Sequence, residues 1–322
     1  MVKAISVENL SVVYRNKKEK VIAVDKISFT VNQGEIFSFL GPSGAGKTTT
    51  QRILTTLLPI SEGKAYVAGY NVLTEAKKVR AKIGYVSQLG GADPNATVSE
   101  NLELTGKLYG LSTDEVAQRI ENLSRLLDFS DLLSRFVRTL SGGQKRRVEI
   151  AQAILHEPKI LFLDEPTTGL DPQNRANLWQ HIKKLRDNGT TVFLTTHYLE
   201  EADALSDQLI ILDHGKIVAE GTPMDLKKKV SGEAISIELK DLKDAAQMKR
   251  LFNHLAIDNV IEADNKFTVY TPDGEKLVAH IFKYSKEHHL ELTNISLSMP
   301  SLNDVFLTLT GKELRDSGKG DK

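Results

Sequence analysis

The glycine-rich segment GPSGAGKT limits the fold of this chain more than any other part of its sequence. It runs from Gly41 to Thr48, after the apolar segment EIFSFL and before TTQRILTTLL, in which Leu and Ile recur at helical spacing. Glycines between a strand and a helix let the backbone curl until successive N–H groups point inward, and the positive end of the helix adds to their attraction for anions. Strand, glycine loop and helix in this order predict an α/β fold with a site for nucleotide phosphates.

Two side chains of this loop have predicted roles of their own. Lys47 is expected to reach the β- and γ-phosphates of ATP, and Thr48 to place its hydroxyl on a Mg²⁺ ion that bridges phosphate oxygens. A glycine turn without a ligand is the alternative, but at average residue frequencies the pattern arises by chance in roughly one of a hundred chains of this length. We therefore assign ATP and magnesium as cofactors, and expect the nucleotide to contact Gly41, Pro42, Ser43, Gly44, Ala45, Gly46, Lys47, Thr48 and Thr49.

A second segment supplies carboxylates for the metal and for the chemistry. KILFLDEP, residues 159–166, is an apolar segment followed by Asp164 and Glu165. Two charges at the end of a buried strand are costly unless they meet cations or hydrogen-bond donors. Asp164 is expected to hold Mg²⁺ through water, and Glu165 to orient or deprotonate the attacking water. A solvated Asp-Glu pair is the alternative, and the glycine loop weighs against it.

His197 follows the apolar segment TVFLTT in the same way. Gly41, Asp164 and His197 thus all lie just beyond the carboxyl ends of apolar segments, where open α/β sheets bind ligands. A histidine after a strand is more often a hydrogen-bonded structural residue. At this edge, however, His197 is placed to contact the γ-phosphate and the region of the general base.

The order of the apolar segments predicts the rest of the first domain. Short segments without alternation, separated by stretches of helical periodicity, are typical of a mostly parallel sheet that is buried on both faces. Two β-rich segments around a polar turn at 16–20 predict an antiparallel β subdomain, and about residues 95–140 are expected to form a helical insert. The segments expected as strands are 4–14 and 21–31 in the hairpin, and 35–40, 159–163, 191–195 and 208–212 in the parallel sheet.

Composition excludes several classes of partner and site. Lys and Arg number 42, as do Asp and Glu, so no excess of positive charge favours nucleic acid or an anionic membrane surface. The chain has no cysteine, which excludes disulfides and thiolate metal sites. Its apolar segments are far shorter than the ~20 residues that cross a bilayer, and the N-terminal MVKAISVENL lacks the apolar core of a signal peptide. The chain is expected in the cytoplasm, with no nucleic acid as its partner.

Three further segments make the sequence resemble one family. LSGGQKRRVEIAQAIL begins at Leu140, KIGYVSQ ends at Gln88, and TTGLDP occupies 167–172. Together with the glycine loop, they resemble the nucleotide-binding domain of ATP-binding cassette (ABC) proteins, a P-loop NTPase fold. The resemblance covers about residues 3–230.

The segment SGGQ, residues 141–144, adds a second phosphate site. Its serine can cap a helix that starts near Gln144, and its two glycines expose the first N–H groups of that helix. One chain cannot easily use both phosphate sites. The resemblance implies a head-to-tail dimer with twofold symmetry, in which each ATP lies between the glycine loop of one chain and the signature segment of the other. The residues that it places at this interface are Ser141, Gly142, Gly143 and Gln144, with Asp171 at the seam.

The resemblance also assigns two more residues to the site. Tyr14 would stack on adenine, and a simple strand aromatic in the hairpin is the alternative. Gln88 would contact Mg²⁺, act with Glu165 and His197 in catalysis, and move with the helical insert.

Two other features are interpreted without a ligand. The basic run Lys145-Arg146-Arg147 is predicted to form the solvated face of the signature helix rather than a nucleic-acid site. Trp179 recurs at helical spacing with Ile182 and Leu185 and is predicted to belong to the core.

The remainder of the chain predicts a second domain. After Ser231 the segments alternate in the order βαββαβ, which indicates a small α+β domain over 231–312, followed by a polar tail at 313–322. PSLNDVFLTLTG, residues 300–311, resembles the C-terminal extension of daunorubicin-resistance-type ABC ATPases, which work with separate ABC-2-type permeases. No catalytic constellation is found there, so our hypothesis is a dimer-stabilising or regulatory role.

These features together predict an ATPase subunit that energises an ABC-2-type exporter at the cytoplasmic face of the cell membrane. Its partners would be a second copy or a paralogous ATPase, and a separate permease that carries the cargo. Drugs or antibiotics are the expected cargo, with lipid or polysaccharide as alternatives. A soluble ABC ATPase acting on DNA or ribosomes is disfavoured by the single glycine loop and the lack of a heptad array. A non-enzymatic sensor is disfavoured because Glu165 and His197 are both present.

Overall fold

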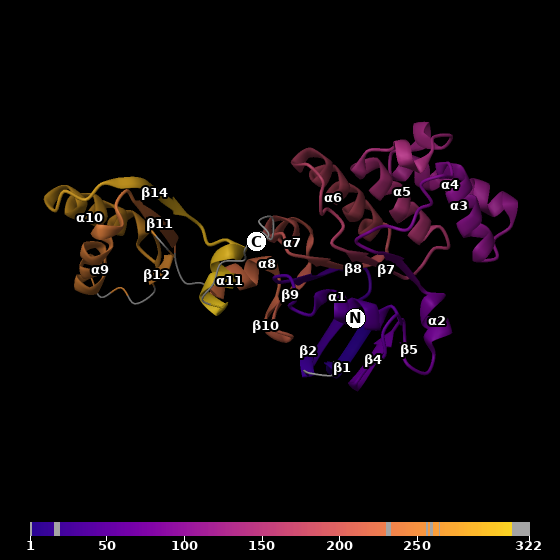
Figure 1. The fold of residues 1–322 in the computed structure, drawn as a ribbon, viewed down its shortest axis with the longest axis horizontal. Helices are drawn as coiled ribbons and strands as arrows, with labels where there is room; N and C mark the ends of the chain where they lie inside the picture. The colour runs from indigo at the N-terminus through magenta and orange to yellow at the C-terminus, as the bar shows by residue number, and fades with distance from the viewer. Residues whose placement is uncertain are drawn as a thin grey trace. The chain divides into compact units, whose positions relative to one another are not determined.

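The computed structural model describes residues 2–15, 20–229, 233–255, 257, 260–263 and 265–310, which form two compact units. The first unit ends at Glu220, and the second begins at Gly221 (Figure 1). Most of the predicted turn at 16–20, the predicted start of the second domain at Ser231 and the predicted tail at 313–322 lie outside the described residues.

A six-stranded sheet forms the centre of the first unit, in the order β10-β9-β3-β8-β7-β6. β3 pairs in parallel with β8 and β9, and β7 pairs in parallel with β6 and β8. Every residue of β3, β7 and β8 is buried, so the prediction of a mostly parallel sheet from segments without alternation is confirmed. The strands are β3 Ile36–Leu40, β6 Ile83–Val86, β7 Ile160–Asp164, β8 Thr191–Thr196, β9 Gln208–Asp213 and β10 Lys216–Gly221.

Helices cover both faces of this sheet. In Figure 1, α5 and α6 lie on one side, and α1 lies on the other side with the N-terminal strands. α3 and α4 lie in the predicted helical insert, and each begins with a capping box, in which a Thr or Ser and the third residue after it accept from each other's backbone N–H. The helices are α1 Lys47–Leu54, α2 Ala76–Arg80, α3 Val98–Leu108, α4 Thr113–Leu126, α5 Gly142–Ile154, α6 Pro172–Asp187 and α7 Leu199–Leu205, with 3₁₀ turns at Ser130–Leu132 and Val137–Thr139.

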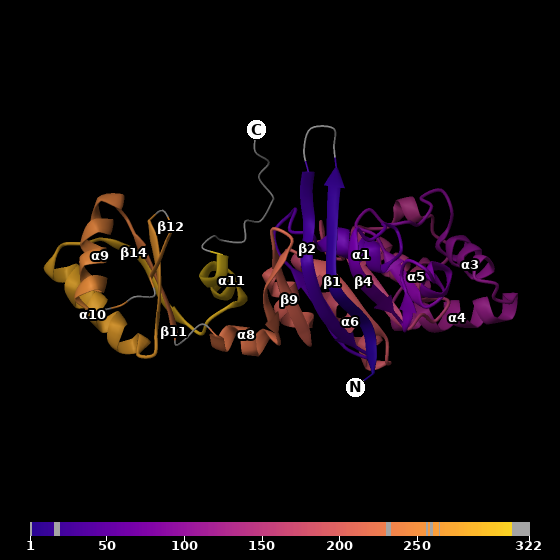
Figure 2. The same cartoon turned by 90° about the horizontal axis from the view of Figure 1, so that it is seen from below.

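An antiparallel sheet in the order β2-β1-β4-β5 completes the first unit. β1 and β2 form the predicted hairpin and run side by side in Figure 2. Phe29 of β2 packs against Phe37 and Phe39 of β3, with ring centroids 5.7 and 5.0 Å apart. These aromatic contacts join the two sheets in one core. The strands are β1 Lys3–Arg15, β2 Lys20–Asn32, β4 Glu62–Val67 and β5 Tyr70–Asn71.

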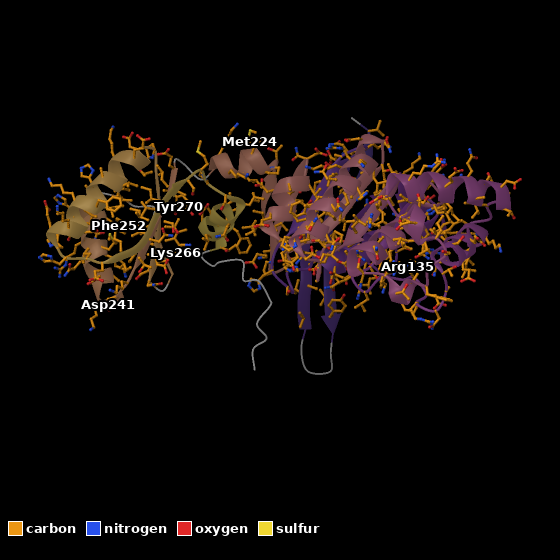
Figure 3. All side chains as sticks on the ribbon, turned by 90° about the horizontal axis from the view of Figure 1, so that it is seen from above. Arg135, Met224, Asp241, Phe252, Lys266 and Tyr270 are labelled. Atoms are coloured by element: carbon orange, nitrogen blue, oxygen red, sulfur yellow. The ribbon has the colours of Figure 1, made fainter. Side chains whose placement is uncertain are left out.

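The second unit contains the predicted βαββαβ order, and its strands form one antiparallel sheet in the order β12-β13-β11-β14. Buried side chains of β11 and β13 pack with those of α9 and α10 in a core of their own. Figure 3 labels Phe252 of α9 and Tyr270 of β13 in this unit. The elements are β11 Glu233–Leu239, α9 Ala245–His254, β12 Val260–Ala263, β13 Lys266–Thr271, α10 Gly274–Glu287 and β14 Leu292–Ser298, with a 3₁₀ turn at Leu242–Asp244.

Two more helices of this unit, α8 (Pro223–Lys229) and α11 (Leu302–Thr310), were not predicted. Tyr270 donates a hydrogen bond of 2.8 Å to Asp304 of α11, and burial together with this carboxylate raises the pKa of the tyrosine. The bond attaches α11 to the sheet. Among the described residues of the whole chain, no helix combines the length and the apolar character that a membrane span requires.

Gly84 of β6 lies where the fold has no room for a side chain, because a Cβ atom there would overlap the carbonyl oxygen of Ala153 on α5. We expect Gly84→Ala to push β6 and α5 apart and to lower the free energy of unfolding by about 1–3 kcal/mol. Urea unfolding followed by the fluorescence of Trp179, the single tryptophan, reports on the first unit. In the control Gly91→Ala, a Cβ has nothing within 4 Å, and the expected change stays within about 0.5 kcal/mol. Equal losses in the two variants would contradict the close approach.

Candidate active site

The glycine loop turns from β3 into α1 through a left-handed residue. α1 begins at Lys47, and Gly46 caps it with a φ of 102°, which glycine adopts without strain. A Cβ at Gly46 would lie 2.5 Å from the carbonyl oxygen of Ala23 on β2, so the loop needs glycine for its close approach to the hairpin as well. The loop borders a cavity of ≈ 270 Å³ lined by Ala23, Ser43, Gly44, Gly46, Lys47, Thr48, Thr49, Gln88 and Glu165.

The ammonium group of Lys47 is buried beside this cavity. It donates hydrogen bonds of 2.7 and 3.0 Å to the carbonyl oxygens of Gly41 and Pro42, and lies 3.8 Å from Oε1 of Glu165. Burial lowers the pKa of Lys47, and the charges of Glu165 and Asp164 act against that shift. A buried cation at the N-terminal end of a helix suits the phosphate groups of a nucleotide.

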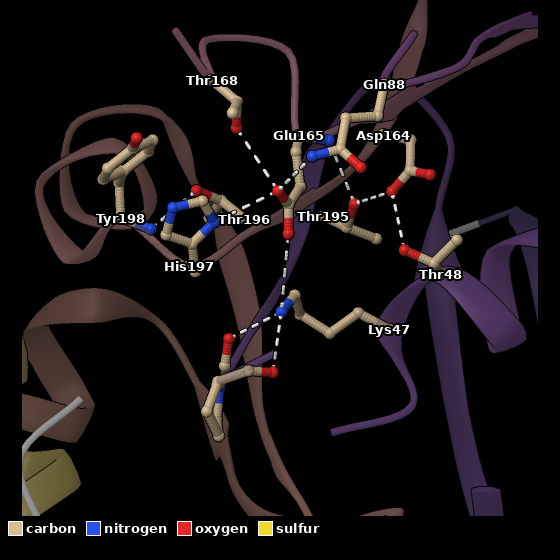
Figure 4. Close-up of polar contacts among 12 residues, drawn as sticks. Lys47, Thr48, Gln88, Asp164, Glu165, Thr168, Thr195, Thr196, His197 and Tyr198 are labelled. Atoms are coloured by element: carbon tan, nitrogen blue, oxygen red, sulfur yellow. Dashed lines mark hydrogen bonds and ion pairs between the residues drawn. The ribbon is translucent and has the colours of Figure 1, made fainter. Parts of the chain in front are cut away.

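Asp164 at the end of β7 accepts from hydroxyl groups of two other elements, α1 and β8. Its Oδ1 atom accepts from the hydroxyl of Thr48 at 3.1 Å and from that of Thr195 at 2.7 Å (Figure 4). Carboxylate and hydroxyl oxygens at the edge of a phosphate site are a donor set that fits Mg²⁺. The motifs did not predict Thr195, whose side chain becomes a partner of Asp164 because β7 and β8 pair at these two residues.

Glu165 is the centre of the polar cluster in Figure 4. Its φ is 45°, a left-handed conformation that non-glycine residues rarely adopt and that often marks a functional site. Its Oε2 atom lies 3.2 Å from Nδ1 of His197, and accepts from Gln88 at 3.2 Å and from Thr168 at 3.3 Å. The backbone N–H of Glu165 donates to the carbonyl oxygen of Thr195 at 3.0 Å.

The surroundings of Glu165 keep it ionised. Burial acts to raise its pKa, but the hydrogen bond and charge of His197 and the charge of Lys47 outweigh burial, and the pKa lies below its ordinary value. A carboxylate in this state can accept a proton from water. His197 itself is 9% exposed at the end of β8, so it is held in place as a partner of Glu165.

The structure gathers the signature residues in a second cluster. α5 begins at Gly142, so the predicted start near Gln144 was two residues late. Ser141 is the N-cap: its hydroxyl accepts from the N–H of Gln144 at 3.3 Å, and Gln144 accepts from the N–H of Ser141 at 3.0 Å. Ser141 and Gly142 are exposed, which leaves the positive end of this helix open to an anion.

The remaining predicted residues divide between the two clusters. Asp171 caps α6 by accepting from Asn174 at 3.0 Å, and a Cβ at Gly143 would lie 2.8 Å from the side-chain oxygen of the same Asn174. The predicted seam residue therefore lies beside the signature. Tyr14 lies beside the glycine loop, with its hydroxyl 3.5 Å from that of Thr49 and its side chain 44% exposed.

The predicted solvated face at Lys145-Arg146-Arg147 is wrong for Arg146, which is buried. Its guanidinium donates to the carbonyl oxygens of Ser87 at 2.8 Å, Pro166 at 2.9 Å and Asp164 at 3.0 Å. A planar group with five donors suits such a set of acceptors. Arg146 thus attaches the signature helix to the residue before Gln88 and to the strand end that carries Asp164.

The exposure of its neighbours, Lys145 and Arg147, differs less from the predicted solvated face. The side chain of Arg147 is 14% exposed; its guanidinium pairs with Asp128 at 2.9 Å and donates to the carbonyl oxygen of Leu127 at 3.2 Å. Lys145 has the most exposed side chain of the three, at 39%. The signal that was missed is helical spacing, because Arg146 shares a face of α5 with the buried residues Ile150 and Ile154.

A buried carboxyl group behind His197 was also not predicted. Glu201 of α7 is fully buried and accepts from the indole N–H of Trp179 at 3.1 Å. Burial raises the pKa of Glu201. Ile182 and Leu185 are buried as predicted, whereas Trp179 is only partly buried and packs at the border of that core.

Comparison with known proteins agrees with this geometry. The family described as ABC transporter matches residues 24–168, and the C-terminal domain of DrrA1-3-like ATP-binding proteins matches residues 221–310. The daunorubicin resistance ATP-binding protein DrrA3 of Streptomyces coeruleorubidus is 37% identical over 97% of each chain. The chain belongs to the ATP-binding proteins of ABC transporters.

Other relatives support the same family. The linearmycin resistance ATP-binding protein LnrL of Bacillus subtilis is 35% identical over 96% of this chain and 99% of its own. A solved dimeric ATP-binding cassette, in a post-hydrolysis state with ADP and Pi, is 29% identical and covers 68% of this chain and 98% of its own, with a TM-score of 0.62. The predicted P-loop fold of an ABC ATPase is confirmed, and the chain is an ATPase with an adenine nucleotide as its ligand.

We expect Glu201 to make the stability of this ABC ATPase depend on pH. Because the folded state raises the pKa of this carboxyl above its ordinary value of 4.5, protonation favours folding. That stabilisation is complete below pH 4.5 and is lost as pH rises through the raised folded pKa. Glu201→Gln carries a neutral amide, so its melting temperature should exceed that of the natural chain by an amount that grows as pH rises from 4.5 to the raised folded pKa and stays constant above it.

Melting curves at several pH values measure the difference. Glu200→Gln is the control, because Glu200 is the exposed neighbour on the same helix. A difference for Glu201→Gln that stays constant with pH, or that matches the control, would show that the buried carboxyl does not carry this dependence.

Proposed function

We propose that this ABC ATPase hydrolyses ATP in two composite sites of a head-to-tail dimer and thereby energises an ABC-2-type exporter. The observation that carries the proposal is that one chain contains two separate clusters, each of which is only part of a nucleotide site. Lys47 and Glu165 line the cavity beside the glycine loop, and Asp164 accepts from Thr48, which lines it as well. Ser141 and Gly142 expose a helix N-terminus on a cluster of their own.

Within one composite site, each residue has a role that suits its surroundings. The glycine loop and Lys47 bind the phosphates, and Tyr14 stacks on adenine. Thr48, Asp164 and Gln88 would hold Mg²⁺. When bound, this ion neutralises charge on the β- and γ-phosphate oxygens.

The chemical step depends on Glu165 and His197. Glu165 orients the attacking water and accepts its proton, for which its carboxylate must be ionised, and its lowered pKa keeps it so. His197 lies 3.2 Å from the carboxylate, and its proposed second partner is the γ-phosphate. Gln88 donates to the same carboxylate at 3.2 Å, so the position of the segment before the helical insert is linked to the base.

The second wall of the site comes from another chain. The cavity of ≈ 270 Å³ is smaller than the range of about 300–1,000 Å³ of complete ligand pockets. The signature of a second copy, or of a paralogous ATPase, would close it with Ser141, Gly142, Gly143 and Gln144, and Asp171 would lie at the seam. The dimeric state of the solved cassette supports this arrangement.

Transport is assigned from the relatives and from the second unit. Two relatives are named for resistance to daunorubicin and linearmycin, and the C-terminal match is to DrrA1-3-like proteins. We propose a separate ABC-2-type permease as the membrane partner, a position at the cytoplasmic face of the membrane, and a drug or antibiotic as cargo. A relative from Ralstonia nicotianae, 35% identical and named for Nod factor export, makes a lipid or polysaccharide the second candidate.

The role of Glu165 is tested by Glu165→Gln, which keeps the shape of the side chain but cannot accept a proton. ATP turnover should fall by about 10²–10⁴-fold, while ATP binding persists and traps the dimer, visible by size exclusion with light scattering. Glu62→Gln, on the exposed face of β4, is the control and should leave both properties unchanged. Normal turnover by Glu165→Gln would exclude this base.

In cells that carry the permease, the variant should also abolish drug resistance, and retained resistance would argue against the exporter role.

The composite site is tested by mixing two inactive chains. Lys47→Met disables the glycine loop; Ser141→Asp keeps a good helix cap but places negative charge where phosphate would bind. Each homodimer should be inactive, whereas a mixed dimer regains one intact site, from the loop of one chain and the signature of the other. An equal mixture should recover about a quarter of the natural turnover per chain. Two copies of the same variant at doubled concentration are the control, and no recovery on mixing would contradict the head-to-tail arrangement.

A further inference from the structure

The strand β14 is an edge of the second unit's sheet. It pairs with β11 on one side, and within the described part of the chain no strand pairs with its other side. Its register with β11 is regular from Asn294 to Ser298 and shifts only near Leu292. Five residues therefore offer a straight row of backbone N–H and C=O groups to a further strand.

The side chains of β14 give this edge none of the usual protection. Its sequence is LTNISLS, without a charge or a proline, and five of its seven residues are exposed. Leu297 is 40% exposed, and Met299, just after the strand, is 80% exposed. Natural sheets discourage pairing at an open edge with charges, prolines or short strands. An unprotected edge of this length indicates that it is paired in the functional state.

The opposite edge of the same sheet shows the contrast. β12 has only four residues, Val260–Ala263. Its Glu262 forms an ion pair of 2.5 Å with Lys249 of α9. A short strand that carries a charge is the usual way to prevent pairing. The two edges therefore differ in the property that decides whether another strand can add.

We propose that β14 pairs with β14 of a second copy, so that the two C-terminal units form one continuous eight-stranded antiparallel sheet across a twofold axis. Pairing about Ser296 places Ile295 opposite Leu297 of the other copy, and Asn294 opposite Ser298. Ile295 and Leu297 lie on the face of the sheet where their β11 partners, Ile237 and Ile235, are buried. Apolar residues then meet apolar ones, and polar residues meet polar ones, without opposed like charges.

A second copy is the occupant that the molecule itself supplies. The inference rests on the proposed dimer, because two cassettes that close on ATP also bring their tethered C-terminal units to an effective concentration in the millimolar range. At that concentration, even a weak pairing of five residues in each strand is populated. A strand of this composition suits a self-complementary pair better than a charged partner, because it has no charged side chain with which such a partner could pair.

A cysteine scan of the full-length chain tests the pairing. The chain has no cysteine, so each variant at 294–298 carries one thiol, and mild oxidation followed by non-reducing electrophoresis shows covalent dimers. A residue on the axis lies about 4.5–5.5 Å from its mate between Cα atoms, which a disulfide can bridge. For a residue two positions away from the axis, the distance between its Cα atom and that of the same residue in the other copy exceeds about 13 Å. Cross-linking should therefore peak sharply, with Ser296→Cys the expected maximum.

Glu262→Cys, on the opposite edge, is the matched control and should stay monomeric on the gel. No peak in the scan, or equal yields at all positions and at the control, would overturn the proposal. A peak that forms only after removal of residues 311–322 would overturn it too, because the edge would then belong to the chain's own C-terminal segment.

The scan is repeated in the Glu165→Gln background with ATP. Dimers that form with ATP but do not cross-link would refute the pairing and leave the proposed function intact. Cross-linking without any ATP-dependent dimer would support the pairing and contradict the proposed function.

Ser296→Lys gives an independent measure, since like charges on the axis should weaken self-association by roughly fivefold, whereas Ser296→Thr should not. Sedimentation at several concentrations measures both, and equal association of the two variants counts against the pairing.

Discussion

The parallel pairing of β3 with β8 and of β8 with β7 aligns Leu40 with Thr196 and Asp164 with Thr195. Each strand therefore ends at the same edge of the sheet, and the residue that follows it enters the same small volume. The glycine loop, the carboxylates and His197 meet there because their strands are in register. Burial at this edge then requires charge compensation, which the pair of Lys47 and Glu165 provides at 3.8 Å.

Arg146 extends that edge to the signature helix. Its guanidinium is buried among the carbonyl oxygens of Ser87, Asp164 and Pro166. Removing it would leave three acceptors without a donor, and Glu149 with only the longer ion pair to Lys145 at 3.8 Å. In the proposed dimer, Asp164 serves the chain's own ATP, whereas Ser141 serves the ATP of the partner. Arg146 is thus a direct physical connection between two half-sites, and a shift of the segment carrying Gln88 bears on both.

Short-range motifs allowed most of the fold and much of the candidate site to be predicted, because strand, loop and helix are set by local patterns. Residues whose partners lie far along the chain were missed. Thr195 bonds a carboxylate 31 positions away, and Glu201 meets Trp179 across 22 positions. Charge alone predicts exposure for Arg146, which is wrong, whereas its helical spacing with Ile150 indicates burial. The helices α8 and α11 were not predicted, because the βαββαβ order alone indicated the topology of their unit and includes neither helix.

The two proposed contacts between copies differ in what they require. We expect the composite site to close only around a nucleotide, because the glycine loop and the signature helix both present positive groups that repel without phosphate between them. Pairing of β14 involves backbone groups and uncharged side chains, so it needs no nucleotide. In the proposed cycle, hydrolysis opens the first contact while the second keeps the copies joined. Closure in the next cycle is then an intramolecular step at an effective concentration in the millimolar range, rather than a new encounter.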